Sequence, residues 1–222
     1  MKKYVLIPIV AIMFSCNSTK TVAESPAPPT DTITTTTPAT GIPPAHNKKF
    51  IQEYFDETYL LIVNATNGLS DEQLNFKSSP EKWSIMECLE HIVVTEPQLF
   101  EYEKDVLSKP ATPEKRNDIK LTDDDIMVMI VDRSFKAKAP AEMAPQGKYK
   151  DVQTALNDLQ KQRKEMMVHL EDYTMDDLRN RVLEGPFGSI DAYQFMLFIP
   201  GHTARHTMQI QEVKQDSNFP KN

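Results

Sequence analysis

Two histidines lie four residues apart in the segment FIPGHTARHTMQIQEV, residues 198–213 of a 222-residue chain. Residues four apart occupy one face of a helix, with about 5–6 Å between their Cβ atoms. His202 and His206 share this face with apolar residues at positions 195, 199, 210 and 213. Both imidazoles are therefore expected to point into the core of the protein.

Two imidazoles in a core need partners, because an unsatisfied buried polar group costs about 1–3 kcal/mol. A divalent metal ion is one solution, since neutral imidazole nitrogens bind zinc at about 2.0–2.1 Å. His91, on the flank of another apolar stripe, is the best candidate for a third ligand. Three histidines leave coordination positions open for water or substrate, which is typical of catalytic zinc. The alternative is a hydrogen-bonded core pair without metal.

Three side chains near these histidines each have a chemical and a structural interpretation. Glu87, one turn before His91, could serve as a general base, but with Ser84 it also fits a helix-capping box. Cys88 could contact a metal or substrate as a thiolate, or be a small buried apolar residue. Arg163 could bind an anionic substrate group or extend to the surface.

Two further polar residues of the same segments are interpreted as surface positions. Glu96 lies one turn beyond His91 and is expected to be solvated. Gln209 either forms hydrogen bonds at the mouth of the site or is solvated.

Four amphipathic stretches must position these residues. Apolar residues recur at spacings of three and four over 46–68, 84–107, 150–172 and about 189–214, which predicts four helices. No segment has a convincing strand pattern, so the predicted fold class is all-α, a four-helix bundle. The connection 108–148 is long enough to cross the end of the bundle and let two helices run parallel. Its middle, residues 122–132, predicts a short helix capped by Thr122.

The N-terminal residues predict export. Two lysines, an apolar run over 5–14 and then Cys16 form the pattern of a signal peptide, and the run is short for a membrane span. The tetrapeptide MFSC, residues 13–16, resembles a bacterial lipobox, which implies cleavage before Cys16 and lipidation of its thiol. The alternative is an ordinary signal peptide. The lipobox predicts a protein of the bacterial cell envelope, anchored to a membrane through its lipid.

The chain is thus divided into four parts. Residues 1–15 are predicted as the signal peptide, 16–45 as a Thr- and Pro-rich tether too polar to fold, 46–215 as the helical domain and 216–222 as a tail. With 40% hydrophobic residues the chain is long enough for one domain with a core. Its net charge of −7 and lack of basic blocks predict no nucleic-acid partner. A homodimer through helix faces is compatible with the sequence.

Two segments in this order, LSDEQLNFKSSPEKWSIMECLEHIVVTE at 69–96 and PGHTARHTMQIQEV at 200–213, resemble the DinB-like superfamily with its YfiT-type metal-dependent hydrolases. The resemblance covers about residues 47–214. It implies helices in up-down-down-up order and a zinc or nickel ion held by three histidines. In this chain those histidines correspond to His91, His202 and His206.

These observations predict an exported, metal-dependent, hydrolase-like enzyme that acts on a small-molecule substrate. The resemblance also implies thiol transfer as a second chemistry, against which export argues because the small thiols concerned are held inside cells. A bundle that only binds a metal or a small ligand is the non-enzymatic alternative, since fold does not determine function.

Overall fold

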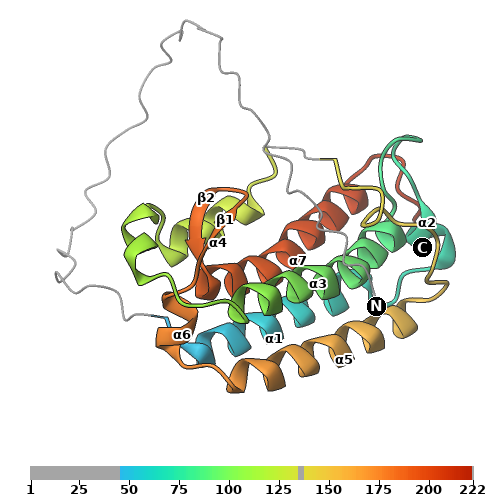
Figure 1. Ribbon diagram of the computed structural model, residues 1–222. Coiled ribbons are helices and arrows are strands. Elements are labelled where there is room, and N and C mark those ends of the chain that lie inside the picture. The colour runs from blue at the N-terminus through green and yellow to red at the C-terminus, as the bar shows by residue number, and fades with distance from the viewer. Residues whose placement is uncertain (1–45, 135–137, 222) are drawn as a thin grey trace, which may run out of the picture. The chain divides into compact units, whose positions relative to one another are not determined.

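Four long helices make up the fold in the computed structural model, which describes residues 46–134 and 138–221. They lie side by side as a bundle (Figure 1) and are α1 (Lys48–Thr66), α3 (Ile85–Leu107), α5 (Val152–Glu171) and α7 (Ala192–Lys214). The predicted all-α, four-helix architecture is therefore confirmed. The signal peptide, the tether and the lipidated Cys16 predicted within residues 1–45 lie outside the described residues.

Local side-chain caps define where the ligand-bearing helices begin. The Ser84 hydroxyl accepts a hydrogen bond from the Glu87 backbone N–H, and the Glu87 carboxylate accepts one from the Ser84 N–H. This capping box starts α3 at the position that the sequence predicts. Asp191 and Gln194 form the equivalent box at the start of α7.

Contacts between helix ends give the direction of each helix. Lys48 Nζ donates to the Tyr173 carbonyl oxygen at 2.9 Å, so the start of α1 lies beside the end of α5. Lys214 Nζ donates to the Ala65 carbonyl oxygen at 3.1 Å, so α7 ends where α1 ends. The end of α3 packs an aromatic ring against one near the start of α7. The bundle therefore has the up-down-down-up order that the resemblance implies (Figure 1).

Short helices occupy the connections between the long ones. The predicted helix in the α3–α5 connection is present as α4, and the Thr122 side chain caps it by accepting from the Asp125 N–H. The short elements are α2 (Asp71–Asn75), η1 (Pro113–Asp118), α4 (Asp123–Val131) and α6 (Met175–Arg179).

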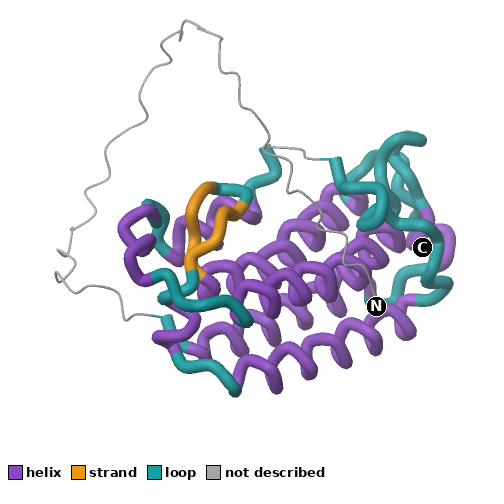
Figure 2. Tube along the Cα trace, viewed as in Figure 1, coloured by secondary structure: helices purple, strands orange, loops and turns teal. Residues whose placement is uncertain are grey.

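A β-hairpin corrects the prediction that the chain contains no strand. Strands β1 (Val182–Gly185) and β2 (Gly188–Asp191) pair antiparallel immediately before α7 (Figure 2). Helix α7 therefore begins at Ala192, three residues later than the start near 189 that the sequence pattern predicts. Leu183 pairs with Ile190, and both side chains are buried. Gly188 has a φ of 104°, a conformation that glycine adopts without strain, and it allows the tight turn.

A polar layer divides the hydrophobic core into two clusters. One cluster contains Ile51, Phe55, Phe100 and Ile199, and the other contains Ile62, Ile92, Leu159 and Ile210. Between them every long helix contributes polar side chains, namely Thr58, His91, Glu96, Arg163, His202, Thr203 and His206. The residues of chemical interest are thus held at one level of the bundle by apolar packing on both sides.

Helix α4 approaches α7 closely at Gly201. A Cβ atom at this position would lie 2.5 Å from Cγ2 of Ile130, well inside van der Waals contact. Glycine therefore lets α4 lie directly against the helix that carries two of the three histidines.

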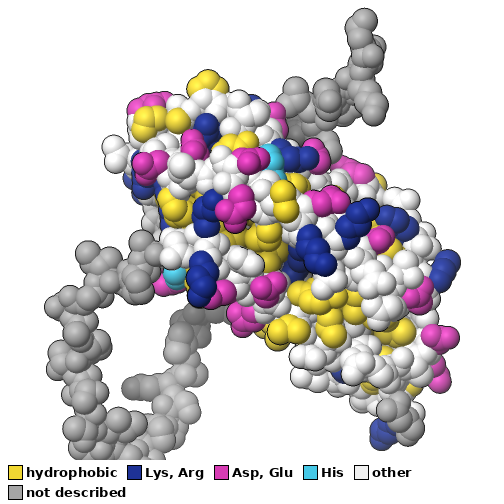
Figure 3. All heavy atoms as spheres, turned by 90° about the horizontal axis from the view of Figure 1, so that it is seen from below, with side chains coloured by type: hydrophobic (Ala, Val, Ile, Leu, Met, Phe, Trp, Pro, Cys, Tyr) yellow, Lys and Arg dark blue, Asp and Glu magenta, His cyan; other side chains and the backbone are white. Residues whose placement is uncertain are grey.

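The surface of the domain is mixed in character. On the face shown in Figure 3, acidic and basic side chains are interspersed around apolar ones. The large apolar side chains exposed among the described residues include Leu60, Leu61, Val128 and Val168. Within 46–134 and 138–221, no helix combines the length and the apolar character needed to cross a bilayer.

Candidate metal centre

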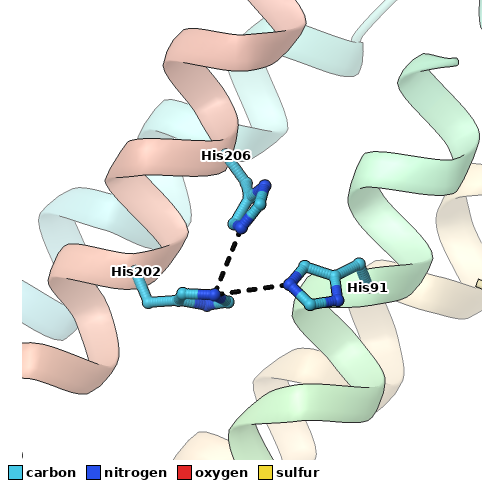
Figure 4. Close-up of side chains that lie close together, drawn as sticks. All are labelled: His91, His202 and His206. Carbon is cyan, nitrogen blue, oxygen red and sulfur yellow. Dashed lines mark hydrogen bonds between the residues drawn. The ribbon is translucent and has the colours of Figure 1, made fainter. Parts of the chain in front are cut away.

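Three histidine side chains point toward one another between α3 and α7 (Figure 4). The Nε2 atom of His202 lies 3.3 Å from that of His91 and 3.1 Å from that of His206. Two nitrogens bound tetrahedrally to one zinc ion at about 2.0–2.1 Å are about 3.3–3.4 Å apart, so these separations fit a shared ion. Within the described part of the chain, this is the one group of His, Cys, Asp or Glu side chains arranged to hold a metal.

Hydrogen bonds on the outer side of two rings determine which nitrogen carries the proton. His91 Nδ1 lies 2.6 Å from the Met143 carbonyl oxygen, which can only accept, so Nδ1 donates and Nε2 keeps its lone pair. His206 Nδ1 lies 3.0 Å from the side-chain oxygen of Gln209, so in His206 too Nδ1 donates and Nε2 keeps its lone pair. Two lone pairs therefore face the Nε2 atom of His202.

This donor set is incomplete without a cation. His202 Nε2 carries at most one proton and can donate to one neighbour only, which leaves the second contact between two acceptors. If Nε2 is protonated, Nδ1 of His202 is an acceptor, and it is buried with no hydrogen-bond partner among the described residues. A cation between the three Nε2 atoms satisfies all of them. This observation favours a metal over a hydrogen-bonded histidine cluster.

Desolvation keeps all three rings neutral. It lowers the pKa of His202 to about 3, with further contributions from His91 and Arg205. It also lowers the pKa of His206 well below its ordinary value, as do the two neighbouring imidazoles to a lesser degree. The pKa of His91 is lowered by desolvation against the opposing effect of its bond to Met143. Because metal binding needs neutral imidazoles, the cluster is in the competent form near neutral pH.

Aromatic rings border the cluster. The Trp83 ring centroid lies 4.7 Å from that of His91, and the Phe198 ring is stacked at 6.3 Å from His202. His202 is partly exposed, whereas the other two histidines are buried. The cluster therefore meets solvent on the side of His202, beside Phe198.

Glu87 and Cys88 do not join the three histidines. The Glu87 carboxylate caps α3 and also accepts a hydrogen bond from Lys77 Nζ at 3.0 Å. Cys88 is fully buried in an apolar cluster, and burial raises the pKa of its thiol, which disfavours the reactive thiolate. Both residues have the structural role that the sequence offered as the alternative to a chemical one.

Arg163 lies in the core rather than in a substrate pocket or at the surface. It donates to both carboxylate oxygens of Glu96 at 3.0 and 2.5 Å. Its other contacts are the Phe55 carbonyl oxygen at 2.6 Å and the hydroxyls of Thr58 and Thr203 at 3.1 and 2.9 Å. All five guanidinium N–H groups are thereby used, which corrects the expectation that Arg163 binds an anionic substrate. It also corrects the expectation that Glu96 is solvated, because Glu96 is 0% exposed.

The outer partners of the histidine rings differ in how far they could be predicted from the sequence. Thr95 Oγ1 lies 3.2 Å from His91 Nδ1, four residues along the same helix. Gln209 follows His206 by three residues on the same helix, a spacing at which side chains meet. The Met143 contact is made by a main-chain carbonyl that lies 52 positions from His91. No sequence pattern signals such a contact.

A bundle of this topology with a three-histidine centre defines the class of protein. The chain belongs to the DinB superfamily, whose family model matches residues 54–210. The matched region contains all three histidines and most of the four long helices.

Two individual proteins are similar over most of the domain. The uncharacterized protein YuaE of Bacillus subtilis is 30% identical over 164 residues, which covers 72% of this chain and 95% of YuaE. The solved structure of YfiT from Bacillus subtilis matches with a TM-score of 0.52 at 15% identity, over 76% of this chain and 86% of that one. YfiT is described as a probable metal-dependent hydrolase with an unusual four-helix bundle topology. At this level of identity the match shows a shared fold.

Proposed function

We propose that this protein is a metal-dependent, hydrolase-like enzyme in which His91, His202 and His206 hold one divalent ion, zinc or nickel. The observation that carries the proposal is the convergence of three Nε2 atoms, two of which are held as lone-pair donors by hydrogen bonds behind the rings. Membership of the DinB superfamily and the fold shared with YfiT support it. When bound, such an ion supplies Lewis-acid polarisation of a substrate and lowers the pKa of water.

The chain itself would determine how a substrate reaches this centre. Three protein ligands leave at least one coordination position unused. The partly exposed side of His202, beside the Phe198 ring, is where a small molecule would approach. Met143 and Gln209 would hold two of the ligands in orientation from behind.

Metal analysis of the purified protein tests this proposal. Wild-type protein is expected to carry roughly one divalent ion per chain, and His202→Ala to lose it, because two remaining imidazoles form a weak site. His169→Ala removes a histidine of α5 outside the cluster and is expected to keep the metal. A wild-type protein that is stable and binds neither zinc nor nickel would refute the proposal.

For a protein that does bind metal, a hydrolysis assay separates an enzyme from a binding protein. Hydrolysis of an ester or amide panel by wild type, lost in His202→Ala, would identify an enzyme.

We further propose that the domain works at the bacterial cell envelope, anchored by a lipid on Cys16 and separated from the membrane by the segment 16–45. The two N-terminal lysines, the apolar run and the MFSC tetrapeptide support this location.

Metabolic labelling with palmitate checks the anchor. Cys16→Ser is expected to abolish the label and to move the protein out of the membrane fraction, because only a thiol can form the thioether. Cys88→Ser is the matched control, and it should keep both the label and the membrane location. Labelling that persists in Cys16→Ser would contradict the proposed anchor.

A further inference from the structure

The end of α4 reaches the back of the metal centre through one glutamine. Arg133 lies two residues after the last residue of α4 and donates through one Nη atom to the side-chain oxygen of Gln209 at 3.2 Å. The same oxygen accepts the hydrogen bond from His206 Nδ1 at 3.0 Å. Arg133, Gln209 and His206 therefore form a continuous hydrogen-bonded chain that ends at a metal ligand.

Arg133 determines which way the Gln209 amide faces. A guanidinium can only donate, so the Gln209 atom that it contacts must be the oxygen and not the NH₂ group. Since that oxygen also faces His206, Nδ1 of His206 must carry the proton. Nε2 of His206 is then left with its lone pair directed at the other two histidines.

The position of Arg133 is itself held by several contacts. Its guanidinium forms a bidentate ion pair with Glu212 of α7, at 2.8 and 2.9 Å. Arg205, also on α7, donates to the Ile130 and Asp132 carbonyl oxygens at the end of α4. With the close approach of Ile130 to Gly201, these contacts attach the end of α4 to the helix that carries the ligands.

We propose that Arg133 and Gln209 are positioning residues of the metal centre. Arg133 orients the Gln209 amide, and Gln209 holds His206 in the Nδ1-protonated tautomer that leaves Nε2 available. The inference rests on the proposed metal function. It extends that function by proposing that residues of the α3–α5 connection hold the ligand imidazoles in the orientation that metal binding needs. That connection also supplies the Met143 carbonyl to His91, so it supports two of the three ligands.

The third ligand provides an internal comparison. Nδ1 of His202 has no hydrogen-bond partner among the described residues, so no outer group selects its tautomer. In the metal-free protein His91 and His206 are expected to be Nδ1–H tautomers, whereas His202, whose Nε2 faces their two lone pairs, is expected to be the Nε2–H tautomer.

Nitrogen-15 NMR of the metal-free full-length chain measures these tautomers directly. Gln209→Met, which keeps the length of the side chain but removes the acceptor, is expected to convert His206 into a mixture. Gln209→Glu keeps an acceptor that Arg133 can pair with, and it should keep the Nδ1–H tautomer. Arg133→Met frees the amide to turn over and should give a partial shift. Arg116→Met removes an arginine of η1 that bonds Asn180, and it should change nothing.

Zinc affinity, measured by competition with a chelator, is the second readout. Loss of an outer partner typically weakens a metal site about 10–100-fold, and Gln209→Met is expected to fall in this range, with a smaller loss for Arg133→Met. Gln209→Glu should bind zinc like wild type. A His206 tautomer unchanged in both Gln209→Met and Arg133→Met would overturn the inference even in a protein that binds zinc. A wild-type chain that binds no metal would instead refute the proposed function, and the NMR comparison would still decide the role of Gln209.

Discussion

Replacing Arg163 with methionine is expected to lower the free energy of unfolding by about 3–5 kcal/mol, because it leaves a buried charge without its partner. The Glu96 side chain is 0% exposed and that of Arg163 is 6% exposed. Without the guanidinium, the Glu96 carboxylate keeps the Thr203 hydroxyl as a donor but no cation. The substitution also removes the hydrogen bonds that connect α5 to α1 and α7. One side chain thus links all four long helices at the level of the metal centre.

Urea denaturation of three variants distinguishes this effect from a general cost of losing an arginine or lysine. Arg163→Met combined with Glu96→Leu should recover most of the loss, since apolar residues of similar volume often replace a buried ion pair without cost. Lys49→Met breaks the exposed ion pair with Glu53 and should change stability by less than about 1 kcal/mol. A loss in Arg163→Met no greater than that in Lys49→Met would contradict the prediction.

Replacing Glu103 with leucine is expected to stabilise the protein by about 1–3 kcal/mol near neutral pH, the usual cost of an unsatisfied buried polar group. Glu103 is fully buried on α3, and neither carboxylate oxygen has a hydrogen-bond partner among the described residues. Desolvation raises the pKa of Glu103 well above its ordinary value, and the nearby Asp191 raises it further. Glu103 therefore destabilises the folded state in either protonation state. Among the side chains that the structure describes, the protonated carboxyl lacks a hydrogen-bond partner, and the charged carboxylate lacks a counterion.

The contribution of Glu103 to the stability of the wild-type protein should consequently fall as pH rises above about 4.3, the pKa of glutamate in an unfolded chain. Over this window the folded state holds the Glu103 proton and the unfolded state does not, so the folded state binds more protons and loses stability with increasing pH. The contribution is about 1.4 kcal/mol per pH unit until the folded pKa is reached. Glu103→Gln should lack this contribution, whereas Glu101→Gln, on the exposed side of α3, should retain it. Equal pH dependence in wild type and Glu103→Gln would refute the assignment.

Features encoded within one helix could be predicted from the sequence. The start of α3 follows from Ser84 and Glu87, which bond each other across one turn. The inward direction of His202 and His206 follows from their spacing within the apolar stripe of α7. The short helix α4 follows from its cap at Thr122. In each case the deciding interactions join residues within about one turn, so the order of residue types is enough.

Features that depend on how helices face one another could not be predicted. Arg163 and Glu96 are 67 positions apart, and their pairing depends on the parallel packing of α5 against α3. The strands of the hairpin are four residues each, too short to show an alternating pattern, and the buried pair Leu183 and Ile190 depends on the core beneath them. The sequence alone is compatible with a solvated Gln209. Its contact with Arg133 depends on the packing of α4 against α7, which the sequence pattern does not reveal.

Helix α7 carries two of the three histidines and packs against α1, α3 and α4. Because it is the last helix of the bundle to be synthesised, a growing chain holds His91 and the Glu96–Arg163 pair without their remaining partners until translation passes residue 214. Contacts between such distant parts of a chain form slowly. The three-histidine cluster and the hydrogen bond from Thr203 to Glu96 should therefore be completed only after α7 has been synthesised.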